Sequence, residues 1–263
     1  MSSAQTLLSV EGLTKSYGGV HAVRGVSFAL RSGEILALIG PNGAGKSTCF
    51  DMLNGQRIPD SGKITLLGRD TTGQAPRVVW RLGVGRTFQI TATFPTMTVR
   101  ENVQVALISH RGLLFNFWSS MPKLARDEAA SLLELVGMSG YADRPCGELA
   151  YGDLKRLELA VALANAPKLL LMDEPTAGMA PRERIDLMRL TARIAREQSI
   201  GVLFTEHDMD VVFEHADRII VLNRGLLIAE GLPEQVRNDP QVRAVYLGGG
   251  LMYDAKHHEG AAT

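Results

Sequence analysis

The chain has few of the features that mark secreted or membrane-spanning proteins. Its 263 residues include only two cysteines, Cys49 and Cys146, which form no metal-binding spacing and make a disulfide framework implausible. The longest apolar runs, such as residues 169–172 and 219–222, are far shorter than the roughly 20 residues that a membrane-spanning helix needs. The first residues lack the basic and apolar regions of a signal peptide. We therefore expect cytoplasmic residence, with any membrane attachment made through a partner.

An excess of charge of either sign is also absent. The 28 basic and 28 acidic residues give a formal net charge of zero at pH 7. No net field therefore draws the protein toward nucleic acid, and we expect no nucleic-acid partner. Apolar residues make up 45% and charged residues 21% of the chain, as in ordinary globular proteins, and the length allows one large domain or two lobes.

A glycine-rich loop between an apolar run and a helix-compatible segment is the most informative stretch. It matches the pattern G-x-x-x-x-G-K-[S/T], whose glycines let backbone N–H groups point inward at phosphates. The lysine then reaches the β- and γ-phosphates, and the following hydroxyl can ligate Mg²⁺. A chance glycine-rich loop is the alternative, and the flanking segments disfavour it. The predicted nucleotide-binding residues are Gly40, Pro41, Asn42, Gly43, Ala44, Gly45, Lys46, Ser47 and Thr48.

The hydrophobic pattern predicts an α/β core. Continuous apolar runs at 35–39, 169–172, 201–205 and 219–222 are typical of strands buried on both faces of a parallel sheet. Alternating runs at 7–10 and 26–30 predict an antiparallel sheet with 64–67. Helical patterns occupy 46–54, 154–165, 181–197 and 210–215.

The segment from 94 to 163 has a different character, because it is mostly helical, with 99–108 and 126–136 its clearest helices. We predict a helical subdomain at about 94–163, inserted into a core made of about 7–93 and 164–230. A C-terminal helical segment at about 231–247 and a flexible tail at 248–263 follow. The aromatic stretch 112–118 is either a buried packing patch or a surface for a partner.

Two adjacent carboxylates, Asp173 and Glu174, follow one of the buried runs. Asp173 at the strand end can hold Mg²⁺ through a water molecule, and Glu174, turned the other way, is placed to polarise the attacking water. A strand end followed by a helix cap is the alternative. With a phosphate loop upstream, the catalytic interpretation is favoured.

These motifs, with Tyr17, Gln89, residues 149–153 and 205–208, occur in the order seen in ATP-binding-cassette (ABC) ATPases, and the resemblance spans about residues 7–247. It implies a RecA-like P-loop NTPase core with an antiparallel β subdomain and an inserted helical subdomain. By this resemblance Tyr17 stacks on the adenine, Gln89 contacts Mg²⁺ and the attacking water, and His207 binds the γ-phosphate and positions Glu174. The catalytic set is then Glu174, His207, Gln89 and Lys46, and the metal ligands are Ser47, Gln89 and Asp173.

The signature motif departs from the family pattern. The family has Leu-Ser-Gly-Gly-Gln, whereas this chain has Leu149 followed by Ala150, Tyr151, Gly152 and Asp153. Ala150 removes a hydroxyl that would bind the γ-phosphate across a dimer, although backbone N–H groups near Gly152 and a helix starting near Leu154 can still face it. We therefore expect weaker binding of ATP in trans. In the segment after Glu174, Ala180 stands where the family usually has an aspartate, which affects coupling between the two sites.

The altered signature, with residues 86–89 upstream and Tyr-Leu-Gly at 246–248, resembles the ATP-binding subunits of bacterial importers for branched-chain amino acids. Importers of urea or amides, a lipopolysaccharide exporter subunit and a non-transport ABC ATPase remain alternatives. The resemblance implies ATP and Mg²⁺ as cofactors. It also implies two transmembrane permease subunits and, indirectly, a periplasmic solute-binding protein. Because the signature lacks its serine hydroxyl, we expect the second ABC subunit of the dimer to be a different one, in a heterodimer. We expect the permeases to dock at about residues 90–99, which join Gln89 to the helical subdomain; burial of their apolar side chains within the subdomain is the alternative.

Overall fold

The computed structural model describes residues 5–87, 93–111 and 125–247. Gln89 and the aromatic stretch 112–118, singled out from the sequence, lie outside these residues, as does the tail 248–263. None of the described helices is long and apolar enough to cross a membrane.

Two sheets organise the chain, as the apolar runs predict. The smaller one is antiparallel, has the order β2-β1-β4-β5, and consists of β1 (Thr6–Tyr17), β2 (Val20–Arg31), β4 (Ser61–Leu66) and β5 (Arg69–Asp70). The larger one has the order β10-β9-β3-β8-β7-β6. Its strands are β3 (Ile35–Ile39), β6 (Val84–Thr87), β7 (Leu169–Asp173), β8 (Gly201–Thr205), β9 (Arg218–Asn223) and β10 (Leu226–Gly231). All its pairs are parallel except the one between β9 and β10.

The helices match the predicted segments and add several that the sequence pattern missed. They are α1 (Lys46–Leu53), α2 (Pro76–Arg81), α3 (Val99–His110), α4 (Arg126–Leu135), α5 (Tyr151–Leu163), α6 (Pro181–Glu197), α7 (Met209–His215), α8 (Pro233–Asn238) and α9 (Pro240–Leu247), with 3₁₀ turns at Ser139–Tyr141 and Cys146–Glu148. α2, the strands β5, β6 and β10, and the break between α8 and α9 were not predicted.

The central strand β3 is buried on both faces, and its side chains divide between two cores. Leu36 and Leu38 point into a cluster that contains Phe50 of α1 and the inner face of the antiparallel sheet. Ile35, Ala37 and Ile39 point into a second cluster that contains residues of α5, α6 and α7. This alternation follows from the two-residue period of a strand. It fixes the end of β3, and so the loop that follows it, between the two layers.

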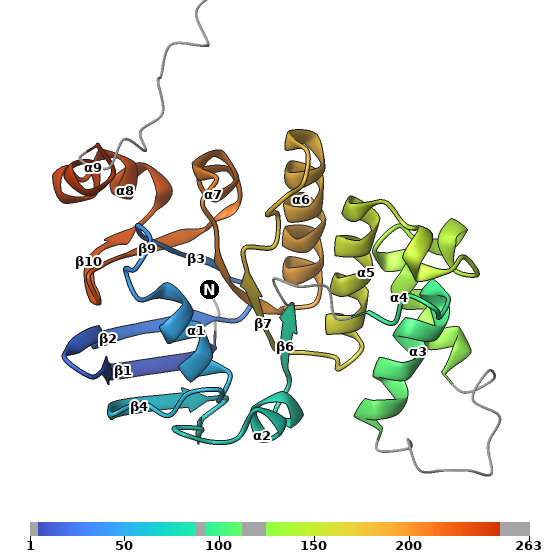
Figure 1. Ribbon diagram of the computed structural model, residues 1–263, viewed down its shortest axis with the longest axis horizontal. Coiled ribbons are helices and arrows are strands. Elements are labelled where there is room, and N and C mark those ends of the chain that lie inside the picture. Colours follow the sequence, from blue (N-terminus) through green and yellow to red (C-terminus); the bar gives the residue numbers. More distant parts are fainter. Residues whose placement is uncertain (1–4, 88–92, 112–124, 248–263) are drawn as a thin grey trace, which may run out of the picture.

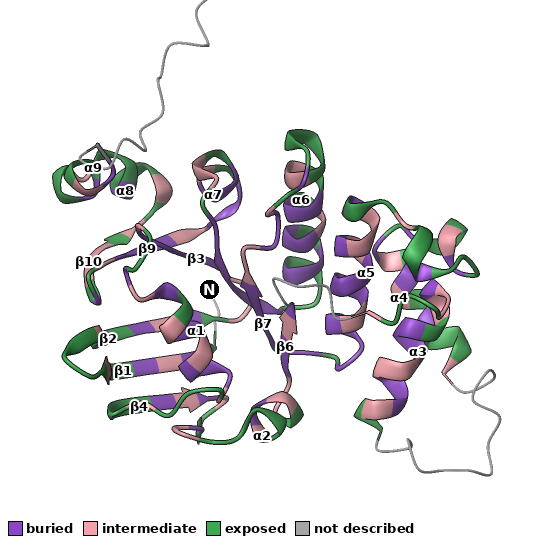
Figure 2. Cartoon of the chain, viewed as in Figure 1, coloured by how far each residue is buried: buried purple, intermediate pink, exposed green. Residues whose placement is uncertain are grey.

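The helices α3, α4 and α5 pack against one another at one end of the molecule (Figure 1). They come between β6 and β7 in the sequence, and α5 also packs on β6 and α6. Figure 2 shows the central strands largely buried, whereas the outward faces of α4 and α6 are exposed. The predicted α/β fold with an inserted helical part is therefore confirmed.

One predicted helix boundary is wrong. The expected start of α5 near Leu154 lies one turn too late, because the helix begins at Tyr151 with Ala150 as its extended N-cap. The Leu154 N–H already donates to the Ala150 carbonyl at 3.0 Å. The apolar periodicity begins only at Leu154, because the first turn of the helix contains Gly152 and Asp153. The hydrophobic pattern therefore did not reveal this turn.

Candidate active site

The glycine-rich loop is held in place by close contacts that only glycine allows. A Cβ on Gly40 would lie 2.2 Å from the Leu222 carbonyl oxygen of β9. A Cβ on Gly45, which has a φ of +105°, would lie 2.3 Å from the Ala22 carbonyl oxygen of β2. The loop is also tied to the β9–β10 turn, since the Gly225 N–H donates to the Ala44 carbonyl at 2.9 Å. Its backbone is therefore shaped by the surrounding sheets before any ligand binds.

The helix that follows the loop offers a site for an anion. Gly45 caps α1 without a side-chain hydrogen bond, and the first turn of this helix carries no acidic residue. The N-terminal N–H groups and the helix dipole therefore attract negative charge at the end of the loop. The Ser47 side chain is exposed there, and Thr48 is half-buried.

Lys46 is folded back onto the loop. Its ammonium donates to the carbonyls of Gly40 at 2.7 Å and Pro41 at 3.2 Å, and only 7% of the residue is exposed. Burial lowers the pKa of Lys46, an effect opposed by the nearby carboxylates of Glu174 and Asp173. The structure thus brings the phosphate loop and the acidic pair to the same edge of the sheet, as predicted.

The acidic pair is organised by Thr205, the residue opposite Asp173 on the neighbouring strand β8. The Thr205 hydroxyl donates to Asp173 Oδ1 at 2.6 Å and accepts from the Glu174 N–H at 3.0 Å. Glu174 has a φ of +49°, a conformation that is strained for a residue with a side chain. This turn sends the two adjacent carboxylates in different directions.

His207 lies against Glu174, with Nε2 2.8 Å from Oε1 of the carboxylate. The ring is partly exposed, since 48% of its side-chain surface is open. A histidine in this position orients the carboxylate and leaves part of its own ring free to contact a ligand. The sequence-based pairing of His207 with Glu174 therefore agrees with the geometry.

This edge of the larger sheet is also supported by residues that had no predicted role. The Glu206 carboxylate is 5% exposed and accepts from the N–H and hydroxyl of Thr176, at 2.8 and 2.6 Å. Asp208 caps α7 and binds the Arg184 guanidinium at 2.6 Å. Glu206 and Asp208 stand within the quoted motif 205–208, which was the available signal; nothing in the sequence pointed to Arg184.

Tyr17 ends β1, away from the acidic pair in the sequence, and is 40% exposed. The Arg57 guanidinium lies 5.5 Å and the Lys15 ammonium 5.8 Å from the ring centroid. Lys15 is itself paired with Asp60 at 2.7 Å. Tyr17 therefore presents an aromatic ring beside two cations, a surface that suits a flat ligand carrying negative charge.

The signature residues 150–153 lie at the N-terminal end of α5, beside the segment that follows Glu174. The Tyr151 ring is 42% exposed and lies 3.3 Å from the position of a Cβ on Gly178. The Glu183 carboxylate lies 2.9 Å from the corresponding position on Gly152. Glu183 also accepts from the Ala180 N–H at 3.1 Å. Asp153 occupies the first turn of the helix, where its negative charge interacts favourably with the positive end of the helix dipole.

No group of three or more His, Cys, Asp or Glu side chains in the described part of the chain could hold a metal ion. The oxygen donors at the sheet edge nevertheless fit Mg²⁺ shared with a phosphate. The Ser47 hydroxyl is exposed, and the Asp173 carboxylate is already oriented by Thr205. Hard oxygen ligands, few in number, are what Mg²⁺ takes from proteins when phosphates complete its shell.

Comparison with known proteins agrees with this site. The family model described as "ABC transporter" matches residues 23–177, and the model "Branched-chain amino acid ATP-binding cassette transporter" matches residues 227–251. The high-affinity branched-chain amino acid transport ATP-binding protein LivG of Salmonella typhimurium is 42% identical, over 93% of this chain and 99% of its own length. The corresponding protein BraF of Pseudomonas aeruginosa is 41% identical with the same coverage.

The chain is also similar to solved structures of ATP-binding cassettes. An ATP-binding cassette of an ABC transporter in its ADP conformation superposes with a TM-score of 0.83 and 33% identity, over 93% of this chain and 99% of that one. A dimeric ATP-binding cassette in a post-hydrolysis state, bound to ADP and phosphate, superposes with a TM-score of 0.73 and 25% identity, over 86% and 99% of the two chains. This chain therefore belongs to the ABC transporter family, as one of its ATP-hydrolysing cassette subunits.

Proposed function

We propose that this subunit powers the uptake of branched-chain or other hydrophobic amino acids from the inner face of the cell membrane. The observation that carries the proposal is the agreement between the 227–251 match and the full-length similarity to LivG and BraF. The generic cassette match ends at residue 177, so the C-terminal match is independent of it. The solute is chosen by partners, a periplasmic binding protein and two permeases.

In the proposed mechanism the loop residues 40–48 bind the phosphates through their N–H groups and Lys46. The ammonium leaves the carbonyls of Gly40 and Pro41 and neutralises phosphate charge in an in-line attack by water. Ser47, Asp173 and Gln89 are the proposed ligands of Mg²⁺, which when bound neutralises charge on the β- and γ-phosphates.

Glu174 is the proposed base or water-orienting residue, and His207 the γ-phosphate sensor. The 2.8 Å contact between them fixes the carboxylate, and Thr205 fixes the backbone that carries it. A carboxylate held at both its side chain and its backbone meets the positional demand of general-base catalysis. Tyr17 stacks on the adenine in this proposal, with Arg57 and Lys15 beside it.

The signature residues 150–153 cap the ATP of a partner cassette in this proposal. Ala150 supplies no hydroxyl for that contact, so the self-dimer should be weak and the working form a heterodimer. The Glu174→Gln protein should stay mostly monomeric with ATP and Mg²⁺ in light scattering. A tight ATP-dependent homodimer at low micromolar concentration would instead favour a homodimeric, exporter-type subunit.

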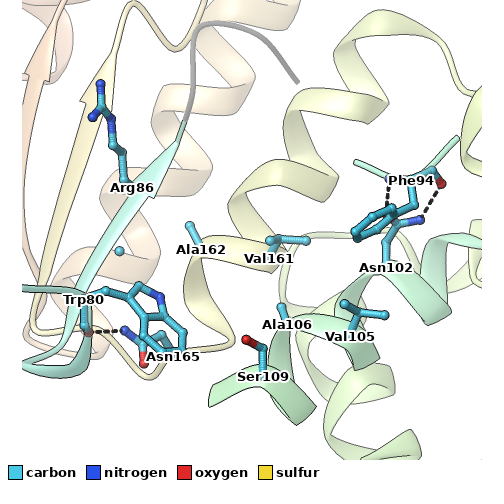
Figure 3. A pocket seen from close by; sticks show the side chains of 11 residues that line it. Trp80, Arg86, Phe94, Asn102, Val105, Ala106, Ser109, Val161, Ala162 and Asn165 are labelled. Carbon is cyan, nitrogen blue, oxygen red and sulfur yellow. Dashed lines mark hydrogen bonds between the residues drawn. The ribbon is translucent and has the colours of Figure 1, made fainter. Parts of the chain in front are cut away.

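The permeases dock, we infer, in the pocket between the core and the helices α3 and α5. This cavity has a volume of about 350 Å³. Figure 3 shows Trp80 and Arg86 on one side of it and Phe94, Ala106 and Val161 on the other. Phe94 is 50% exposed, and Asn102 holds its backbone through the N–H at 2.7 Å and the carbonyl at 3.2 Å. Phe94 belongs to the predicted docking segment 90–99; Met97 of that segment is half-buried, and residues 90–92 lie outside the described chain.

A short cytoplasmic helix of a permease is the proposed occupant of this pocket. Its lining is mainly apolar, and Asn165 at its edge is held in place by its amide nitrogen, which donates to the Trp80 carbonyl at 2.7 Å. An apolar helix face fits this lining. We propose that residues 94–163, inserted between the core segments 7–93 and 164–230, follow the permease as a unit.

Deleting the gene in the source organism and measuring uptake of radiolabelled leucine tests the function. Uptake should be lost, restored by the wild-type gene, and not restored by Glu174→Gln. Urea and acetamide serve as control solutes. Normal leucine uptake with lost urea or amide uptake would assign the subunit to a different importer.

A further inference from the structure

Two chain segments leave the same edge of the larger sheet and carry the proposed catalytic residues Glu174 and His207. The segment 174–180 follows β7 and begins with Glu174, and the segment 206–208 follows β8 and contains His207. The first runs into α6 and the second into α7, and these two helices pack side by side (Figure 1). The 2.8 Å contact between His207 and Glu174 therefore depends on how the two segments are held relative to each other.

The first link between the segments lies close to the sheet. The Glu206 carboxylate accepts from the N–H and the hydroxyl of Thr176, at 2.8 and 2.6 Å, and both residues are buried. The other oxygen of the same carboxylate accepts from the His207 N–H at 3.1 Å. This link ties the backbone on one side of His207 to the segment that begins with Glu174.

Arg184, near the start of α6, makes a second link. Its Nε donates to the Met179 carbonyl at 2.8 Å, and its Nη1 donates to Asp208 Oδ2 at 2.6 Å. The other oxygen of Asp208 caps α7 by accepting from N–H groups in the first turn of that helix. The guanidinium therefore joins the end of one segment to the residue directly after His207. It is suited to this, because its donors lie in one rigid plane and can serve two acceptors at once.

This bridge is shielded from water more than an ordinary surface ion pair. The Arg184 side chain is 31% exposed and the Asp208 side chain 26% exposed, and Met179 is only 4% exposed. Farther along the same helix, Arg196 pairs with Asp217 at 3.0 Å, but these side chains are 59% and 41% exposed. Exposed pairs contribute little, whereas breaking a shielded charged hydrogen bond leaves its partners poorly solvated.

We propose that Arg184 is a positioning residue for ATP hydrolysis, which keeps His207 against Glu174 by tying the two segments together. Without the guanidinium, Asp208 is released from the segment that begins with Glu174, and the link nearer the sheet remains. His207 is then fixed on one side instead of two, so the Glu174 carboxylate is less often in the productive orientation. This inference rests on the proposed roles of Glu174 and His207.

The test compares Arg184→Gln, Asp208→Asn and the double variant with the wild type, using the purified full chain. Asp208→Asn removes the charged acceptor and keeps a side chain that caps a helix well. Arg196→Gln is the matched control, because it removes the same group from the same helix at a pair that lies outside the bridge. We measure kcat and KM for ATP, together with the melting temperature.

Each single variant should lower kcat about five- to tenfold and change KM less than about twofold, because the bridge orients Glu174 and does not shape the phosphate loop. The double variant should be no more than about twofold slower than the slower single variant, because both substitutions break the same link. Arg184→Lys should recover part of the lost kcat, since an ammonium keeps the charge without the planar fork. Arg196→Gln should keep the wild-type kcat and KM.

A wild-type kcat in either single variant would overturn the inference, even with a lower melting temperature, because Arg184 would then serve only the stability of the fold. So would losses that multiply in the double variant, or an equal loss in Arg196→Gln. Glu174→Gln separates this inference from the roles it rests on. If Glu174→Gln abolishes turnover and Arg184→Gln does not slow it, only the role of Arg184 fails. If Glu174→Gln keeps the wild-type kcat, the proposed role of the carboxylate fails and this inference fails with it.

Discussion

Thr205 gives the most direct test of how the acidic pair is built, because a single hydroxyl serves both carboxylates. Thr205→Val keeps the shape of this fully buried side chain and removes its two hydrogen bonds. The Glu174 N–H retains a partner, since it also donates to the Thr205 carbonyl at 3.2 Å. The loss therefore falls mainly on the 2.6 Å bond to Asp173.

A hydrogen bond to a charged group contributes about 1.5–3 kcal/mol. Asp173 is only partly buried, so water can replace part of the lost bond, and we take about 1.5–2 kcal/mol as the effect. If the orientation of Asp173 and Glu174 is needed in the transition state, kcat falls about 10- to 30-fold. The melting temperature should fall by about 3–8 °C, because 1 kcal/mol corresponds to about 2–4 °C in a chain of this size.

Steady-state ATP hydrolysis by the purified chain, with calorimetry alongside, measures both quantities. Thr205→Ser is the matched control, since it keeps the hydroxyl and removes only a methyl group. It should retain at least about one third of the wild-type kcat, which corresponds to less than about 0.7 kcal/mol. A Thr205→Val protein with the wild-type kcat would refute the idea that this hydroxyl positions the acidic pair.

Three further predictions follow from the same site and its surroundings. Glu174→Gln should bind ATP normally and nearly abolish turnover in a phosphate-release assay, because it keeps the shape and removes the base; an unchanged rate would refute the role of the carboxylate. Tyr17→Ala should weaken ATP affinity by about 1 kcal/mol in a binding titration while Tyr17→Phe does not, and equal affinity in all three proteins would place the adenine elsewhere. Burial lowers the pKa of His215 below its ordinary 6.5, so the unfolded chain binds the extra proton and stability should fall as the pH drops below about 6.5. In urea denaturation His215→Gln should lose less stability between about pH 7.5 and 5.5 than the wild type, and equal losses would contradict the assignment.

The parts of the fold that the sequence predicts are those in which side-chain pattern and burial agree. The run 201–205 is apolar throughout and becomes β8, buried on both faces. The short strand β6 could not be found this way, because it contains a glycine, an arginine and a threonine. Its burial depends on packing, since a Cβ on Gly85 would lie 2.7 Å from Leu170 and 2.9 Å from the Ala162 carbonyl. Only the assembled structure shows that a glycine there lets α5 approach the sheet.

The phosphate loop and the acidic pair were predictable for a related reason. Their residue types are fixed by chemistry, and strand order brings the ends of β3 and β7 to one edge. The role of Arg184 was not predictable, because one of its two partners is the Met179 carbonyl. A bond to the backbone leaves no mark on the residue type of its partner.

The end of β8 connects the proposed chemistry to the proposed assembly. The four side chains of the segment 205–208 make four different contacts. Thr205 binds Asp173, and Glu206 binds Thr176 in the segment after Glu174. His207 contacts the Glu174 carboxylate, and Asp208 binds Arg184. Arg184 follows Glu183, whose carboxylate lies against Gly152 at the start of the signature helix. A short series of contacts therefore runs from the hydrolysis site to the signature of the same subunit. Because that signature faces the partner's ATP in the proposed dimer, a shift at Glu174 on hydrolysis has a direct physical route to the second site, even with alanine in place of the usual aspartate.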